Sequence, residues 1–146
     1  MTEIGNPNRP LQRAGVLDSE PNEWRRRFDL LVQNLNGMVY RCANDALWSM
    51  EYVSVGAEAL TGYRPEQLIG NAEIGYGELI HSGDRERVWA DIQAALAARR
   101  AFRLTYRIRD RFGNEKWVWE QGVGVPAADG SVAAAGRIYH RHLRIA

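Results

Sequence analysis

Apolar and polar side chains alternate strictly from residue 102 to residue 109, in the stretch FRLTYRIR. A two-residue period predicts a β-strand with one apolar face, because successive side chains of a strand point to opposite sides of the sheet. The pattern breaks at Gly113-Asn114, where a turn is favoured, and resumes with Trp117 and Trp119. The sequence therefore predicts a hairpin whose second strand runs from about Glu115 to Val125.

Two other stretches show the helical period. One begins near Pro21 and ends at Asn36-Gly37, and its apolar stripe consists of Trp24, Phe28, Leu31, Val32 and Leu35. Proline suits the first turn of a helix, and glycine commonly follows the last turn. The second stretch begins near Ser82, which can cap a helix, and ends with Arg99-Arg100, whose charges suit the negative end of the helix dipole. We therefore expect an amphipathic helix at each place.

The remaining segments are shorter. MVYRC and LWSMEYVS predict an antiparallel pair of strands, and SVAAAGRIYHRHL predicts a final strand after a turn at Asp129-Gly130. Residues 55–80 contain five glycines and a proline, which allow only short helices such as GAEALTG and RPEQLIG. The element order predicts an α+β fold with one antiparallel sheet and its helices on one face.

Length and composition predict one cytoplasmic globular domain after a polar leader, residues 1–19. No apolar run reaches the roughly 20 residues of a membrane helix. Net charge is +1, and the 19 basic residues are spread along the chain, so nucleic acid is not an expected partner. The single cysteine, Cys42, cannot form an internal disulfide and is expected to be a buried apolar filler.

Three motifs in this order resemble the PAS domain, of the PAS-plus-PAC type found in bacterial sensor proteins. They are EYVSVGAEALTGYRPEQLIGN, IHSGDRERVWADI and LTYRIRDRFGNEKWVW, followed by the turn ADG and Gly136. The resemblance implies a five-stranded antiparallel sheet, with short helices and one longer helix enclosing a small cavity. It implies a PAS/PAC domain over residues 37–146, preceded by the amphipathic helix at residues 20–36.

Matching the hairpin to the family assigns its two faces. The resemblance implies an inward, ligand-cavity set: Met50, Tyr52, Leu60, Tyr76, Trp89, Ile92, Tyr106, Ile108, Glu120 and Ile138. Glu120 stands out, because a carboxylate in an apolar interior must pair, accept hydrogen bonds or stay protonated. It either recognises a ligand or makes a structural hydrogen bond inside a filled core. The outward set, expected to meet a second subunit or the amphipathic helix, is Trp24, Phe28, Leu31, Trp117, Trp119, Val123 and Tyr139.

The resemblance also limits the cofactors. Light-sensing relatives carry a reactive cysteine after the asparagine of a Gly-x-Asn-Cys-type motif, but Gly70-Asn71 is followed here by Ala72, which excludes the covalent flavin photocycle. Haem-binding relatives take a histidine from the long helix, and DRERVWADIQAALAARR contains none. A non-covalent small ligand remains compatible. We expect no metal at His140 and His142, which lack a third ligand nearby, and no catalytic residues.

The resulting hypothesis is a sensory and dimerisation input module, a homodimer belonging to a longer sensor histidine kinase. A diguanylate cyclase or a transcription regulator is an alternative parent. Two readings from other classes stay open: a small α+β enzyme or ligand carrier with a cavity, and a protein-interaction domain with a filled core. One departure concerns signal relay: His140-Arg141-His142 stands where the family commonly has an Asp-Ile-Thr-type motif leading to the output helix.

Overall fold

The computed structural model describes residues 23, 26–27, 30–32 and 36–141. Of the helix expected at residues 20–36, the described residues before Asn36 are helical, while Trp24 and Phe28 lie outside the described residues. The chain divides into two units, Met1–Asn34 and Leu35–Ala146, and the second contains the sheet. The fold of this second unit positions every site discussed below.

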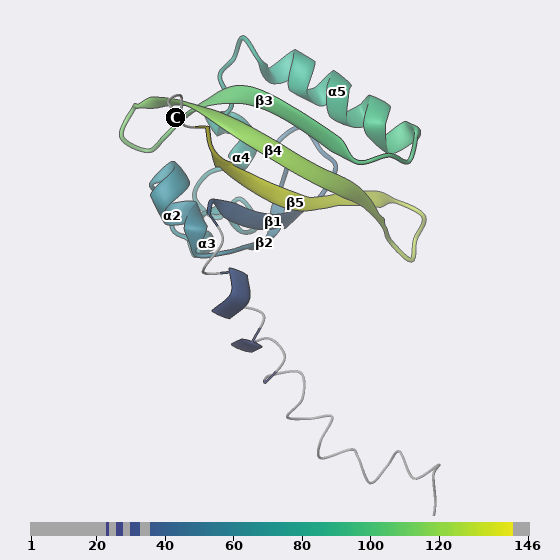
Figure 1. The fold of residues 1–146 in the computed structure, drawn as a ribbon, viewed down its shortest axis with the longest axis horizontal. Coiled ribbons are helices and arrows are strands. Elements are labelled where there is room, and N and C mark those ends of the chain that lie inside the picture. Colours follow the sequence, from purple (N-terminus) through teal and green to yellow (C-terminus); the bar gives the residue numbers. More distant parts are fainter. Residues whose placement is uncertain (1–22, 24–25, 28–29, 33–35, 142–146) are drawn as a thin grey trace, which may run out of the picture. The chain divides into compact units, whose positions relative to one another are not determined.

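Five antiparallel strands form one curved sheet in the order β2-β1-β5-β4-β3 (Figure 1). The strands are β1 (Met38–Cys42), β2 (Met50–Val53), β3 (Phe102–Arg109), β4 (Glu115–Pro126) and β5 (Val132–His140). β3 and β4 form the hairpin that the alternation predicts, with Tyr106 opposite Val118 and Leu104 opposite Glu120. The five-stranded α+β fold expected from the sequence is confirmed.

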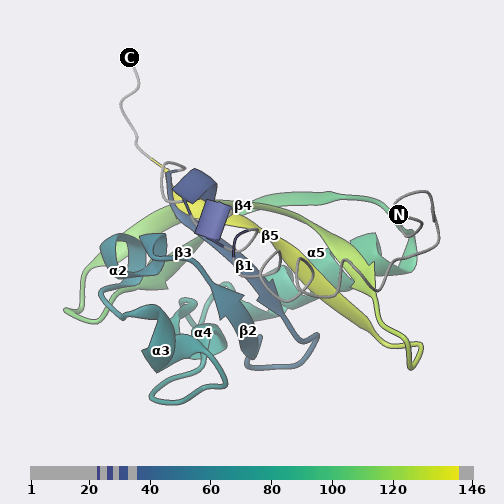
Figure 2. The ribbon, with the colours of Figure 1, turned by 90° about the horizontal axis from the view of Figure 1, so that it is seen from below.

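The helices lie on one face of this sheet (Figure 2). They are α2 (Gly56–Thr61), α3 (Pro65–Leu68), α4 (Tyr76–Leu79) and α5 (Arg85–Ala97). The long helix starts later than its sequence suggested, since Asp84, and not Ser82, is the residue before its first turn. Asp84 accepts hydrogen bonds from the backbone N–H of Arg107 at 2.9 Å and from its guanidinium at 2.8 and 3.0 Å. This tertiary anchor joins the start of α5 to β3.

An irregularity in β2 corrects one sequence-based assignment. Met50 lies opposite Cys42, and Tyr52 lies opposite Arg41, with a register shift between Arg41 and Cys42. Residues directly opposite each other share a face of the sheet. Tyr52 therefore lies on the outer face with Arg41, and its expected place in the cavity is wrong, because a bulge breaks the simple two-residue alternation.

The core fills the space between the helices and the inner face of the sheet. Its largest fully buried side chains include Tyr40, Tyr76 and Tyr106, surrounded by aliphatic residues from every strand and from α5. Burying side chains of this size supplies most of the stability of a domain, at roughly 1.5–3 kcal/mol each. The three phenol groups bring polar atoms into this apolar interior, where each must find a hydrogen-bond partner.

Candidate functional site

Glu120 lies at the centre of the inner face of the sheet. It sits in the middle of β4, opposite Leu104 of β3 and Ile138 of β5, and only 4% of the residue is exposed. The alternation along β4 carries it there, because Val118 is also buried whereas Trp117 is exposed. A carboxyl group placed among apolar neighbours is costly, so the groups around it decide what it can do.

Three tyrosines supply those groups. The Tyr40 hydroxyl donates a short hydrogen bond to Glu120 Oε2, and the Tyr106 hydroxyl donates to Glu120 Oε1 at 2.7 Å. The Tyr76 and Tyr106 hydroxyl oxygens are 2.9 Å apart. Since the single proton of Tyr106 goes to Glu120, Tyr76 is the donor in this last bond. We call Tyr40, Tyr76, Tyr106 and Glu120 the buried tyrosine–glutamate network.

Burial raises the pKa of Glu120 above its ordinary value, and the hydrogen bonds from Tyr40 and Tyr106 act in the opposite direction without cancelling it. Burial also raises the pKa of each phenol, and the negative charge of Glu120 adds to that effect. Within the described part of the chain, no cation forms an ion pair with this carboxyl group. Its ionised form is therefore stabilised by hydroxyl dipoles alone.

The interior beside the network is almost completely filled. A void of about 10 Å³ adjoins Glu120, whereas a single water needs about 10–15 Å³. Its lining includes five of the predicted cavity residues: Met50, Tyr76, Ile92, Glu120 and Ile138. The others in the lining are Tyr40, Cys42, Trp48, Ile80 and Ala134. A ligand larger than water would have to displace these side chains.

The remaining predicted cavity residues lie elsewhere. Tyr106 is in the network, and Leu60 and Ile108 are buried in the core without lining the void. Trp89 is exposed on α5, where its ring lies 5.2 Å from that of Trp48, so its expected place in the cavity is wrong. The side chain of an α5 residue reaches the interior only from the stripe that contains Ile92.

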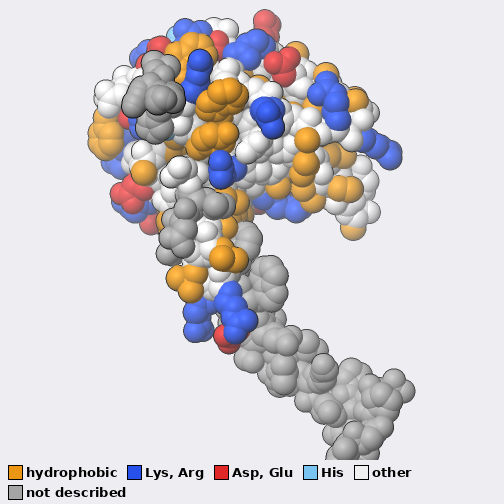
Figure 3. All heavy atoms as spheres, viewed as in Figure 1, with side chains coloured by type: hydrophobic (Ala, Val, Ile, Leu, Met, Phe, Trp, Pro, Cys, Tyr) orange, Lys and Arg blue, Asp and Glu red, His pale blue; other side chains and the backbone are white. Residues whose placement is uncertain are grey.

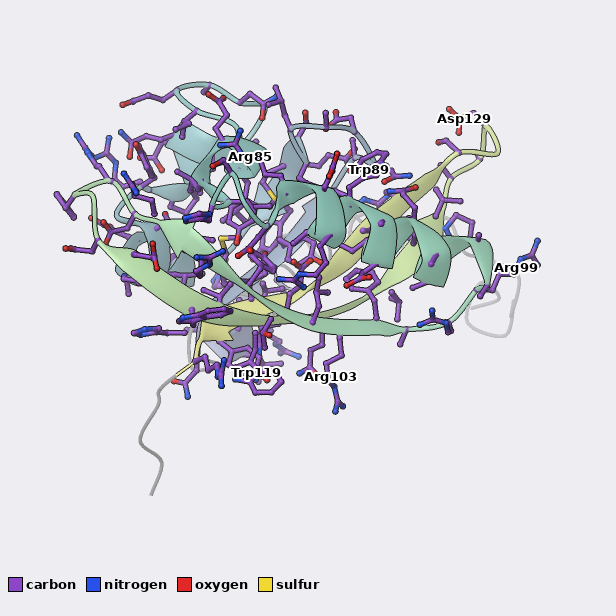
Figure 4. The ribbon with its side chains drawn as sticks, turned by 90° about the horizontal axis from the view of Figure 1, so that it is seen from above. Arg85, Trp89, Arg99, Arg103, Trp119 and Asp129 are labelled. Carbon is purple, nitrogen blue, oxygen red and sulfur yellow. The ribbon has the colours of Figure 1, made fainter. Side chains whose placement is uncertain are left out.

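The outer face of the sheet carries a second cluster. Trp119 lies opposite Thr105 on one side and Tyr139 on the other, and Figure 4 shows Trp119 on the face away from α5. Trp117 and Val123 point the same way and are 38% and 48% exposed. We call Trp117, Trp119 and Tyr139 the outer aromatic cluster.

Arginines surround these rings. Arg141 lies over Trp117 and Trp119 at 5.6 and 5.8 Å, and Arg137 lies over Tyr139 at 4.3 Å. Figure 3 shows hydrophobic and basic side chains interspersed on this side of the molecule. The Nε of Arg137 is buried without a hydrogen-bond partner among the described residues. The outer face is thus both aromatic and cationic, a combination enriched in protein interfaces.

Sequence reasoning missed two features of these sites. Tyr40 was not among the expected cavity residues, although the alternation in MVYRC places it inward with Met38 and Cys42. The arginines of the outer face also escaped notice, because Arg137 and Arg141 approach the aromatic rings only through the pairing of β4 with β5. The first could have been found by extending the inward–outward assignment to β1.

Metal binding and thiol chemistry have little support in the described residues. They contain no group of three or more His, Cys, Asp or Glu side chains arranged to hold a metal ion. Burial raises the pKa of Cys42 well above its ordinary value, so this thiol is held protonated and unreactive. None of the helices described here is long and apolar enough to cross a membrane.

One family model matches more than half of the chain. A family model described as the PAS fold matches residues 50–136. The White collar 2 protein of Neurospora crassa is 35% identical over 80 residues, which cover 55% of this chain and 14% of that protein. The chain therefore spans only a small part of the length of this curated relative.

Solved structures show the same fold. The PAS domain of an HTR-like protein from Haloarcula marismortui matches with a TM-score of 0.68 and 15% identity, covering 87% of this chain and 99% of that one. A sensory box histidine kinase/response regulator from Burkholderia thailandensis matches with a TM-score of 0.59 and 27% identity, over 78% and 83% of the two chains. The N-terminal domain of a diguanylate cyclase with PAS/PAC sensor from Marinobacter aquaeolei gives 0.58 and 19%, over 72% and 94%.

Proposed function

Since the chain belongs to the PAS family, we propose that it is a non-catalytic input module of a sensor histidine kinase, and that it relays its signal through contacts made by the outer face of its sheet. The likeness to a sensory box histidine kinase at 27% identity supports this parent. A diguanylate cyclase is the alternative parent, supported by the neighbour from Marinobacter aquaeolei. In either case the module acts by changing how another domain or a second copy binds.

The observation that carries this proposal is the contrast between the two faces of the sheet. The inner face is closed over a void of about 10 Å³. The outer face presents the aromatic cluster together with Val123, and large exposed apolar groups gathered on one face are typical of interaction surfaces. Homodimerisation through the outer aromatic cluster is the simplest form of this contact, since a two-fold axis would bring the rings of both copies together.

Replacing Trp119 by Arg tests the proposal. This change places a charge inside the proposed contact and should weaken a dimer by about 2 kcal/mol or more, which is roughly thirtyfold in the dissociation constant. Sedimentation equilibrium of the 146-residue chain measures the mass, and urea unfolding checks the fold. Phe112→Arg is the matched control, because Phe112 is a 73% exposed aromatic residue outside the cluster. If Trp119→Arg left the mass and the stability unchanged, this role of the outer face would be wrong.

Detection of a small ligand is a second candidate function, favoured by Glu120. A buried carboxyl group without a cation could accept hydrogen bonds from a ligand that takes the place of the Tyr40 and Tyr106 hydroxyls. Native mass spectrometry of freshly purified protein, with its visible absorption spectrum, tests this directly. A retained small molecule or chromophore would favour ligand sensing, whereas an empty, colourless protein would favour the contact mechanism.

A further inference from the structure

β4 extends beyond the strand that pairs with it. β3 begins at Phe102, opposite Gly122, so residues 123–126 of β4 pair with β5 only. The N–H of Arg141 donates to the carbonyl of Trp117, which shows that odd-numbered residues of β4 direct their backbone groups toward β5. By the alternation of an antiparallel ladder, the N–H and C=O of Gly124 point to the opposite, unpaired side. Residues 123–126 therefore form a short open edge at the end of β4, which is otherwise paired on both sides.

A groove runs along this edge. It has a volume of about 440 Å³ and lies between the end of α5 and the β4–β5 hairpin. Its apolar lining consists of Leu96, Ala101, Val123, Pro126 and Val132. Gly124 keeps the groove open, because a Cβ there would lie 2.8 Å from Leu96 Cδ2. Figure 4 shows Asp129 at the hairpin tip and Arg99 after the end of α5, both at the same end of the molecule. The volume lies within the range of ligand-binding clefts.

Three arginines give the groove a positive rim. Arg99 and Arg100 line it, and Arg103 lines a neighbouring trough that shares Ala101 and Val123 with it. All three are exposed, and among the described residues none has a carboxylate within salt-bridge distance. The nearby acid at the hairpin tip, Asp129, is occupied by hydrogen bonds from the N–H and hydroxyl of Ser131. These neutral donors leave the negative charge of Asp129 in place, but three arginines outnumber this one acid, so the net charge of the rim is positive.

The backbone at Arg99 adds a further observation. Its φ is +56°, a left-handed conformation at the end of α5, where glycine is the usual residue. A side chain in this conformation costs on the order of 1 kcal/mol. A basic residue near the C-terminus of a helix suits the dipole, and that explains the charge. The left-handed position ends α5, because the N–H of Arg99 donates to the carbonyl of Leu96 at 3.1 Å and the N–H of Arg100 donates to the carbonyl of Ala95 at 3.0 Å.

We propose that this edge of β4 binds an extended, acidic peptide segment of a partner protein, which adds as a short strand beside residues 123–126. Its backbone would bond the N–H and C=O of Gly124, its carboxylates would pair with Arg99 and Arg100, and its apolar side chains would enter the groove over Leu96. Pro126 has no N–H, so the added strand is short and side-chain charge supplies much of the affinity. The site shares Val123 with the outer face but contains no residue of the buried network or of the outer aromatic cluster, and binding of an added strand goes beyond the proposed function.

Three short synthetic peptides, labelled with fluorescein, test this on the 146-residue chain. One alternates glutamate with valine, the second has lysine in place of glutamate, and the third keeps the glutamates but carries N-methyl groups on its backbone. We expect the first to bind, by fluorescence anisotropy, and to shift the Gly124 amide resonance in ¹H–¹⁵N spectra. The other two should bind at least roughly tenfold more weakly, since one lacks the charge pairs and the other the backbone bonds.

Variants of the chain complete the test. Arg99→Glu with Arg100→Glu should abolish binding of the acidic peptide, and Gly124→Val should do so by filling the groove. Arg109→Glu is the matched control, because Arg109 is an exposed arginine at the other end of β3. Circular dichroism checks that each variant folds, and the double arginine variant alters only exposed side chains.

Three outcomes would overturn the proposal. If the N-methylated peptide bound as tightly as the first, the attraction would be charge alone and no strand would be added. If Arg109→Glu weakened binding as much as the double variant, the groove would not be the site. If decanoate shifted the Gly124 amide while no peptide bound, the groove would be a site for small anionic amphiphiles. Trp119, whose replacement tests the dimer, does not line the groove, so the two proposals can fail separately.

Discussion

Replacing Tyr40 by Phe probes the charge state of Glu120 directly. Tyr40 is the donor to Oε2, while Tyr106 serves Oε1, so the change leaves one carboxylate oxygen without its hydrogen bond. A hydrogen bond to an ionised group contributes about 1.5–3 kcal/mol, against about 0.5–1.5 kcal/mol for a bond between neutral groups. We therefore expect Tyr40→Phe to lower the free energy of unfolding by about 1.5–3 kcal/mol at pH 8.

Tyr76→Phe is the matched control. It removes the same hydroxyl group from a buried tyrosine, but that hydroxyl bonds to the neutral Tyr106 and not to the carboxyl group. The expected loss is about 0.5–1.5 kcal/mol and should be the same at pH 5 and pH 8. At pH 5, close to the ordinary pKa of 4.5, the raised pKa of Glu120 leaves more of its carboxyl group protonated, so the cost of Tyr40→Phe should fall toward that of the control.

Urea unfolding of the unchanged protein and of both variants, followed by tryptophan fluorescence at both pH values, gives the four losses in the free energy of unfolding. The slopes of the unfolding curves should be unchanged, because neither variant alters the surface exposed on unfolding. If Tyr40→Phe cost no more than Tyr76→Phe at pH 8, and neither cost depended on pH, Glu120 would be neutral in the folded protein. The description of the network as an ion held by hydroxyl dipoles would then be refuted.

Three further outcomes follow from the structure. The raised pKa of Glu120 means that stability is lost as pH rises from about 4.5 through the folded value, so Glu120→Gln should flatten that part of the stability–pH curve. The pKa of Asp84 is lowered from 3.8 to about 2 by its hydrogen bonds with Arg107. Asp84→Asn should therefore cost about 2 kcal/mol at neutral pH, and acid titration should show the cost shrinking below pH 3.8. Gly56→Ala, whose Cβ would lie 1.8 Å from the Gly37 carbonyl oxygen, should cost about 2 kcal/mol in thermal melts; an unchanged melting temperature would contradict it.

The sequence predicted best where the backbone period alone decides the outcome. In the hairpin of β3 and β4, the alternation indicated which residues share a face, and the family resemblance indicated which face is inward. In the structure Tyr106 and Glu120 are buried and Trp117 is exposed. A strand places successive side chains on opposite faces whatever it packs against, so once the turn is fixed the faces follow.

The sequence predicted less well where a distant partner intervenes. The bulge between Arg41 and Cys42 places Tyr52 on the outer face, which no local pattern signals. The start of α5 differs from the prediction for a similar reason. Asp84 is held by Arg107 of β3, so the helix begins after Asp84, and Ser82 lies in the preceding turn. In both cases the energy of a contact made across the fold outweighed a local preference.

By itself, the sequence determined the order of the elements and which residues of the hairpin share a face, while the family resemblance indicated the inward position of a carboxyl group. Only the tertiary structure decided what that carboxyl group meets, since Tyr40 and Glu120 are separated by 80 residues and lie on strands that do not pair with each other. It also decided that a void of only about 10 Å³ is left beside Glu120, and that β4 extends beyond β3 to leave an open edge. The size of a void depends on how whole elements pack, and an open edge depends on where two neighbouring strands end. The local periodicity of a sequence predicts neither of these.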